Sequence, residues 1–70
     1  MGDDMENRQL EAFLHVVQYQ SFSRAAEALD LTQPSLSARI ISLEKEIGEP
    51  LFQRLGRGVR LTEAGRAFQP

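Results

Sequence analysis

Apolar residues near the start of the chain recur at the spacing of an amphipathic helix. The pattern predicts a helix from Asn7 to about Gln18. Its apolar members follow an i, i+3, i+4, i+7 order: Leu10, Phe13, Leu14 and Val17. This order places them on one stripe that faces a core, with polar residues on the opposite side.

A second, shorter helix is predicted from Ser23 to Leu29. Ser23 is a suitable N-cap, and the residues after it are strong helix formers. Ala25 and Ala26 are small enough to let another helix cross closely. Asp30 follows, and aspartate tolerates the left-handed backbone of a sharp turn better than most non-glycine residues.

The third predicted helix, Thr32 to Ile47, has clear signals at both ends. Thr32 is an N-cap, Pro34 falls in the first turn where a missing N–H does no harm, and Gly48 is a C-cap. The apolar stripe consists of Leu36, Ile40, Leu43 and Ile47. The outer side is nearly free of acidic and bulky residues in its first two turns. Two short helices joined by a tight turn predict a helix-turn-helix, with this helix as its recognition helix.

After Pro50 the pattern changes from helical to alternating. Residues 51–61 predict a two-stranded β-hairpin with a glycine-containing loop. Phe52, Val59 and Leu61 are expected to face the helices. Arg54 and Arg60 are expected to point away from the helices, and Arg57 is expected at the tip of the hairpin. The hairpin forms the wing of a winged helix-turn-helix.

The predicted fold class is therefore mainly α, with three helices, a two-stranded β wing and the start of a further helix. Residues 1–6 are expected to be a disordered or vector-derived start, and residues 7–62 to form the winged helix-turn-helix domain. Residues 63–70 are expected to be the truncated start of a linker helix, because their apolar face has nothing left in the chain to cover it.

Composition narrows the possible classes of protein. Seventy residues make one small domain. The absence of cysteine excludes zinc-finger, iron–sulfur and disulfide frameworks. No apolar run approaches the roughly 18 residues of a membrane span, so a cytoplasmic protein with no membrane partner is expected.

The net charge of −2 is unusual for a nucleic-acid binder, but the charge is unevenly distributed. Residues 1–30 contain six acids and two arginines, whereas residues 51–70 contain four arginines and one acid. Charges farther apart than a Debye length of about 8 Å are largely screened, so the local balance matters most. The basic end coincides with the predicted wing.

Polar groups near the start of the third helix are candidates for DNA contact. Gln33 can bond adenine through its amide, and Pro34 and Ser37 either contact base edges or provide clearance. The candidates for phosphate contact are Ser23, Arg24, Ser35, Arg39 and Ser42. For each of these serines, capping or plain exposure is nearly as good an interpretation. Wing arginines can follow phosphates or enter a narrow minor groove.

These residues together resemble the N-terminal DNA-binding domain of LysR-type transcriptional regulators. The resemblance runs from about Arg8 to Phe68 and is carried by LEAFLHVVQYQSFSRAAEAL, LTQPSLSARIISLEKEIGEPLF and RGVRLTEAG. It implies a winged helix-turn-helix followed by a long linker helix that pairs two subunits. It also implies a missing C-terminal domain that binds a small-molecule effector. The implied partner is promoter DNA with an imperfect inverted repeat, bound by a homodimer or tetramer of the full-length protein.

One position departs from the family pattern. Many members carry arginine at the place of Ala38, whereas here Arg39 follows one residue later, about 100° around the helix. A guanine contact by arginine from the middle of the outer face is therefore not expected. Ala38 is instead a candidate for contact with a thymine methyl group.

Other classes of function fit less well. One histidine, no cysteine and no inward pair of carboxylates leave no group for catalysis, a metal site or a cofactor in this domain. A winged-helix module for protein–protein contact is the alternative, favoured by the acidic first helix. The basic wing and the acid-free start of the third helix favour DNA.

Overall fold

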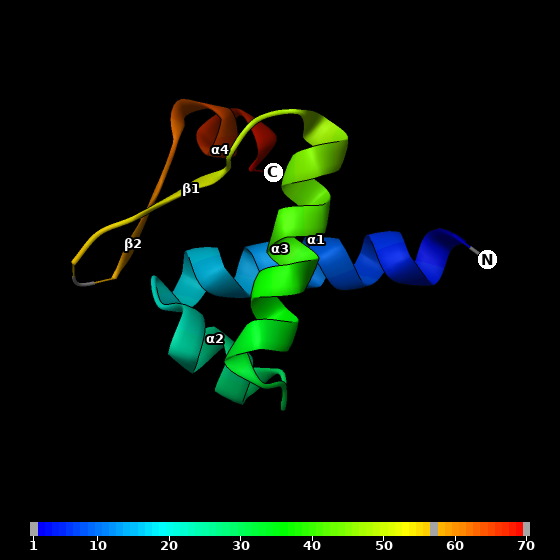
Figure 1. The fold of residues 1–70 in the computed structure, drawn as a ribbon, viewed down its shortest axis with the longest axis vertical. Helices are drawn as coiled ribbons and strands as arrows, with labels where there is room; N and C mark the ends of the chain where they lie inside the picture. The colour runs from blue at the N-terminus through cyan, green and yellow to red at the C-terminus, as the bar shows by residue number, and fades with distance from the viewer. Residues whose placement is uncertain (1, 57, 70) are drawn as a thin grey trace.

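The computed structural model describes residues 2–56 and 58–69. Its elements are α1 (Gly2–Tyr19), α2 (Phe22–Ala28), α3 (Gln33–Ile47), β1 (Phe52–Arg54), β2 (Val59–Leu61) and α4 (Glu63–Phe68). Helix α3 crosses α1, and α2 lies beside the N-terminal end of α3 (Figure 1). The β1–β2 hairpin extends from the region of the C-terminal end of α3. The predicted winged helix-turn-helix is confirmed.

The first helix begins earlier than its apolar pattern indicates. Helix α1 starts at Gly2, so residues 2–6 continue the helix instead of forming an irregular start. The stretch after Gly2 contains no proline or further glycine, so no residue type there stops the helix from extending backwards from Asn7. The predicted boundary at Asn7 is therefore wrong, while a vector origin for residues 1–6 stays a prediction.

Helix α1 buries a face that overlaps the predicted stripe only in part, at Phe13 and Val17. Phe13 is fully buried, but Leu10 and Leu14 are 39% and 38% exposed. The buried residues of α1 are Gln9, Ala12, Phe13 and Val16. This set also follows helical spacing, and the methyl side chain of Ala12 allows a neighbouring helix to approach closely. The predicted stripe was therefore rotated, because this part of the sequence is apolar on more than one side.

The second helix starts at Phe22, and its N-cap lies two positions before the predicted one. Ser21, not Ser23, is the N-cap, and its hydroxyl oxygen accepts from the backbone N–H of Arg24 at 3.2 Å. Phe22 is buried in the first turn, so the helix begins where this ring enters the core. The turn at Asp30 is confirmed by its left-handed φ of 57°.

Helix α3 has the predicted caps. The Thr32 hydroxyl oxygen accepts from the backbone N–H of Ser35 at 3.2 Å, and Gly48 adopts a φ of 90°. Three members of the predicted stripe are buried: Leu36, Ile40 and Leu43. Ile47 is 37% exposed, so its assignment to the core is wrong. It lies in the last turn, beside an open cavity that Leu10 and Phe68 also line.

The wing packs on the helices through one face. Strands β1 and β2 are antiparallel and pair Phe52 with Leu61, Gln53 with Arg60 and Arg54 with Val59. The apolar residues of these strands pack against the core, as predicted: Phe52, Val59 and Leu61. The Phe52 ring lies 5.3 Å from that of Phe13 and 5.9 Å from that of Phe22, measured between centroids. These ring contacts place the wing relative to α1 and α2.

Candidate nucleic-acid interface

The N-terminal half of α3 forms an exposed surface. Gln33, Pro34, Ser35 and Ala38 are exposed, and Ser37 is half-buried. The first turn contains no acidic residue. Small side chains and a first turn without acidic residues allow a helix end to approach the polyanionic DNA backbone closely.

A hydrogen bond connects this surface to α2. The Gln33 Nε2 atom donates to Ser23 Oγ at 2.6 Å. Gln33 is a predicted base contact and Ser23 a predicted phosphate contact, and the structure brings the two side chains together. Arg24, which follows Ser23 in the first turn of α2, is exposed. The start of α2 and the start of α3 therefore form one continuous polar surface.

Arg54 connects the wing to the same surface, which corrects its predicted direction. Side chains alternate along a strand, so Arg54 lies on the same face of β1 as Phe52 and not on the outer face. Its guanidinium carbon lies 4.0 Å from the centroid of the Phe22 ring. Its Nη2 atom donates to Ser37 Oγ at 2.9 Å. Arg54 is exposed, but it leans towards α2 and α3 instead of projecting away from the helices.

Two further candidates lie on the other flank of α3. At about 100° per residue, Arg39 and Ser42 are turned away from Ser37. Ser42 Oγ accepts from the Nε2 atom of Gln9, a buried residue of α1, at 2.8 Å. This bond makes Ser42 part of the α1–α3 contact but leaves its hydroxyl proton free, so its phosphate contact stays a prediction. Arg39 is half-buried.

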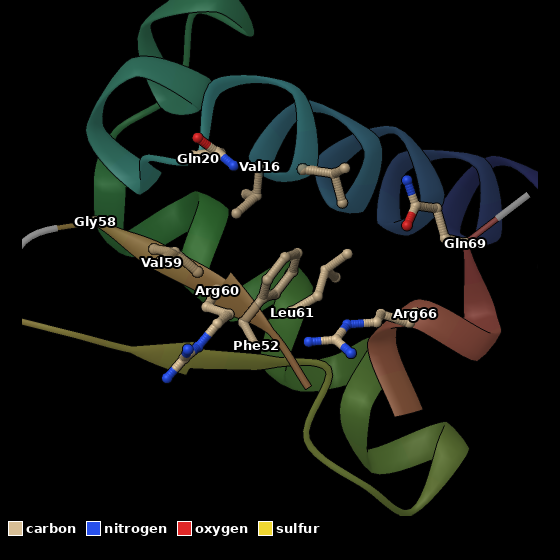
Figure 2. Close-up of a pocket in the computed structure, with 10 residues that line it drawn as sticks. Val16, Gln20, Phe52, Gly58, Val59, Arg60, Leu61, Arg66 and Gln69 are labelled. Carbon is tan, nitrogen blue, oxygen red and sulfur yellow. The ribbon is translucent and has the colours of Figure 1, made fainter. Parts of the chain in front are cut away.

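Arg60 lies on the side of the wing away from the Arg54–Ser37 contact. Arg60 pairs with Gln53 across the strands, is exposed and lies on the face opposite Arg54. Arg60 and Arg66 both line a cavity of about 560 Å³ bounded by α1, the wing and α4 (Figure 2). Its apolar wall includes Val16 and Val17. Arg57, the predicted tip residue, lies outside the described residues.

Glu44 supports the wing, a role with no sequence signal. Its Oε2 atom accepts from the backbone N–H of Leu51 at 2.7 Å and from that of Phe52 at 3.3 Å. These bonds attach the start of β1 to α3. Ile41 was also missed: it is 50% exposed on the outer side of α3 and lines a cavity with Ser37 and Arg54.

We expect Glu44→Ala to loosen the wing. Both backbone donors lose their acceptor, and hydrogen bonds to charged groups are worth about 1.5–3 kcal/mol. Because Glu44 is only half-buried, a loss of about 1–2 kcal/mol is expected, measured by thermal unfolding followed by circular dichroism. Glu46→Ala, which removes an exposed acid on the same helix, is the control. Equal melting temperatures for the two variants would contradict this role for Glu44.

Residues 2–56 and 58–69 offer neither a cluster of metal ligands nor a membrane-spanning helix. No group of three or more His, Cys, Asp or Glu residues in these ranges could hold a metal ion. Nor does any helix formed by these residues have the length and apolarity to cross a membrane.

A model of the bacterial regulatory helix-turn-helix proteins of the LysR family matches residues 7–66. The chain belongs to the LysR family. The match includes the helix-turn-helix, the wing and the first residues of α4. It confirms the family resemblance found in the sequence.

Curated relatives in this family are longer than this chain. The chain is 56% identical to the transcriptional regulator BudR of Klebsiella aerogenes over 64 residues, which are 91% of this chain and 45% of that protein. It is 54% identical to the RuBisCO operon transcriptional regulator of Allochromatium vinosum over 59 residues, 84% of this chain and 20% of that protein. The chain thus spans less than half the length of both relatives.

Solved structures in the family include complexes with DNA. The complex of the CbnR DNA-binding domain with DNA matches with a TM-score of 0.83 and 38% identity, covering 87% of this chain and 70% of that one. The complex of the BenM DNA-binding domain with catB site 1 DNA matches with a TM-score of 0.82 and 44% identity, covering 87% and 68%. The winged helix-turn-helix of this LysR-family chain is therefore the fold found in these DNA complexes.

Proposed function

We propose that this chain binds double-stranded DNA with sequence specificity, as the DNA-binding domain of a LysR-type transcriptional regulator. The observation that carries the proposal is the exposed, acid-free start of α3 between Ser23 on α2 and Arg54 on the wing. No part of the described chain covers Gln33, Pro34 or Ala38, which are exposed. The similarity to two protein–DNA complexes supports the same function.

In the proposed complex, the start of α3 enters the major groove. The residues that read base edges are Gln33, Pro34, Ser37 and Ala38. A helix N-terminus with neighbouring hydroxyls is well suited to phosphate oxygens, because its N–H groups and hydroxyls are hydrogen-bond donors. Ser23, Arg24, Ser35 and Arg39 are assigned to phosphates on this basis. The wing, with Arg60 and Arg57, follows the backbone or the adjacent minor groove.

The full-length protein is proposed to act as a dimer or tetramer. A linker helix continuing from α4 would pair two copies, so that two α3 helices meet successive major grooves of an inverted repeat, about one turn apart. A small-molecule effector would bind in a domain outside this chain. The named relatives are transcriptional regulators, and we assign no catalytic step and no cofactor to this domain. The cytoplasm is the proposed location.

A salt titration tests DNA binding directly. With the chain and a pool of random-sequence duplexes, we expect affinity to fall steeply between about 50 and 200 mM salt, because neutralised phosphates release counterions. Fluorescence anisotropy of labelled duplex measures the dissociation constant at each salt concentration. Single-stranded DNA of the same length is the control. An absence of duplex binding even at 50 mM salt would favour a protein-contact module instead.

A further inference from the structure

Arg54 is held by two elements at once. Its guanidinium carbon lies 4.0 Å from the centroid of the Phe22 ring on α2, and its Nη2 atom donates to Ser37 Oγ on α3 at 2.9 Å. Phe22 is 6% exposed and its ring contacts the ring of Phe52 on β1, so the surface under the guanidinium is well supported. A planar guanidinium can stack on a ring and still donate in its own plane.

The bond between Arg54 and Ser37 favours a serine that donates to a ligand over one that accepts from it. A guanidinium has donors and no acceptor, so Ser37 Oγ must be the acceptor. A hydroxyl has one proton and two acceptor lone pairs; this bond occupies one lone pair and leaves the proton free. The Ser37 hydroxyl therefore keeps its proton available to an acceptor outside the protein, and the positive guanidinium beside it disfavours the approach of a second donor to its remaining lone pair.

The major groove offers acceptors at some bases and not at others. Guanine presents N7 and O6, adenine N7 and thymine O4, whereas cytosine presents the N4 amino donor. A serine held as a donor distinguishes these groups. A serine free to rotate can donate or accept and therefore discriminates less.

The geometry points to Arg54 as a positioning residue for base recognition: it holds Ser37 as a hydrogen-bond donor, so that a wing residue determines sequence preference at the base pair that Ser37 contacts. This inference rests on the proposed DNA-binding function. It assigns the wing arginine a role beyond uniform attraction to phosphates. Sequence reasoning alone predicts that loss of Arg54 weakens binding to all duplexes equally.

Arg60 provides a matched comparison. It is also an exposed arginine of the wing, but it lies on the opposite face of the hairpin. Among the hydrogen bonds formed by the described residues, none joins Arg60 to α3. The two arginines carry the same charge, so any difference between the effects of their substitutions on DNA binding is due to their positions and not to their charge.

The experiment starts from the wild-type chain and a random duplex library, from which the preferred sequence is selected. Dissociation constants are then measured for that duplex and for its single-base-pair variants. The proteins compared are wild type, Ser37→Ala, Arg54→Ala, Arg54→Lys, Arg60→Ala and the Ser37→Ala/Arg54→Ala double variant. Thermal unfolding by circular dichroism checks that each variant is folded, and Arg54→Lys retains the aliphatic stem and charge at this exposed position.

We expect Ser37→Ala and Arg54→Ala to lose discrimination at the same base pair, where the wild type prefers its base by about tenfold. The double variant should lose no more discrimination than Ser37→Ala alone. Arg54→Lys should keep the salt dependence of binding but lose the base preference. A lysine ammonium is not planar, so it cannot stack on the Phe22 ring and at the same time donate parallel to that ring. Arg60→Ala should weaken binding to all duplexes by the same factor, and it should lower the slope of log affinity against log salt concentration by about one.

Two results would overturn the inference. One is a full wild-type preference in Arg54→Lys or Arg54→Ala, which would leave Arg54 with a charge role only. The other is a double variant whose fold-loss of base discrimination equals the product of the fold-losses in the two single variants. Failure of the proposed function looks different, because the wild-type chain would then select no duplex from the library.

Discussion

Phe13→Ala is expected to remove about 3–5 kcal/mol of stability, the usual cost of deleting a buried phenyl ring. Phe13 is fully buried, and its ring lies 5.3 Å from that of Phe52 on the wing and 5.1 Å from that of Phe68 on α4. A domain of this size has a total stability of only about 5 kcal/mol or less. The variant should therefore be largely unfolded at 37 °C, since one ring connects α1 with the wing and α4.

Urea unfolding followed by circular dichroism at 222 nm measures this loss. Leu14→Ala is the matched control, because it truncates a neighbouring apolar residue of α1 that is 38% exposed. We expect Leu14→Ala to cost less than about 1 kcal/mol, as substitutions outside a packed core usually do. The sequence pattern places both residues on one stripe, whereas the structure separates them. Similar losses in the two variants would contradict the buried face assigned to α1.

Most features specified by local backbone chemistry were predicted well, with the N-cap of α2 as the exception. The N-cap at Thr32, the C-cap at Gly48 and the turn at Asp30 each depend on one residue and its immediate neighbours. The change from helical to alternating spacing likewise located the wing. Fold class followed because these signals occur in the order of a winged helix-turn-helix, and the family match confirms the result.

Features that depend on packing between elements were predicted less well. The sequence between Leu10 and Val17 is apolar on several sides, so its periodicity permits more than one buried face. The position of α3 selects the face, and it also provides Ser42 as the partner that allows Gln9 to be buried. A polar residue at 2% exposure has no signal in the sequence, because its hydrogen-bond partner is 33 residues away.

The same difference between local features and packing features explains which residues of the candidate site were predicted. The surface residues of α3 were identified because they lie opposite an apolar stripe on one helix. The direction of Arg54 was not, although strand alternation with Phe52 could have indicated it. Its contacts with Phe22 and Ser37 come from three separate elements. Glu44 is similar, since its acceptor role depends on how the chain returns to α3 after Pro50.

Gly65→Ala is expected to destabilise the domain, although replacing glycine by alanine inside a helix usually stabilises it by about 0.5–1 kcal/mol. Gly65 is buried in α4, against the start of the wing. A Cβ atom there would lie 2.2 Å from the backbone oxygen of Leu51 and 2.7 Å from a methyl carbon of Leu61. The Leu51 oxygen cannot move freely, because it accepts from the backbone N–H of Thr62 at 3.0 Å.

Relief of this overlap requires α4 to move away from the wing. That movement strains the Thr62–Leu51 hydrogen bond and the cap in which Gly65 N–H donates to Thr62 Oγ1. We expect a loss of about 2–3 kcal/mol, at the upper end of the cost of overpacking. A loss of this size lowers the melting temperature of a small domain by roughly 10–20 °C.

Gly56→Ala is the control, because a Cβ atom at Gly56 would meet nothing within 4 Å. Its melting temperature should stay within a few degrees of wild type, as expected for a surface substitution. If Gly65→Ala proved as stable as Gly56→Ala, the close contact between α4 and the start of the wing would be wrong. The angle at which α4 leaves the domain would then not depend on that contact, and neither would the direction of the proposed linker helix.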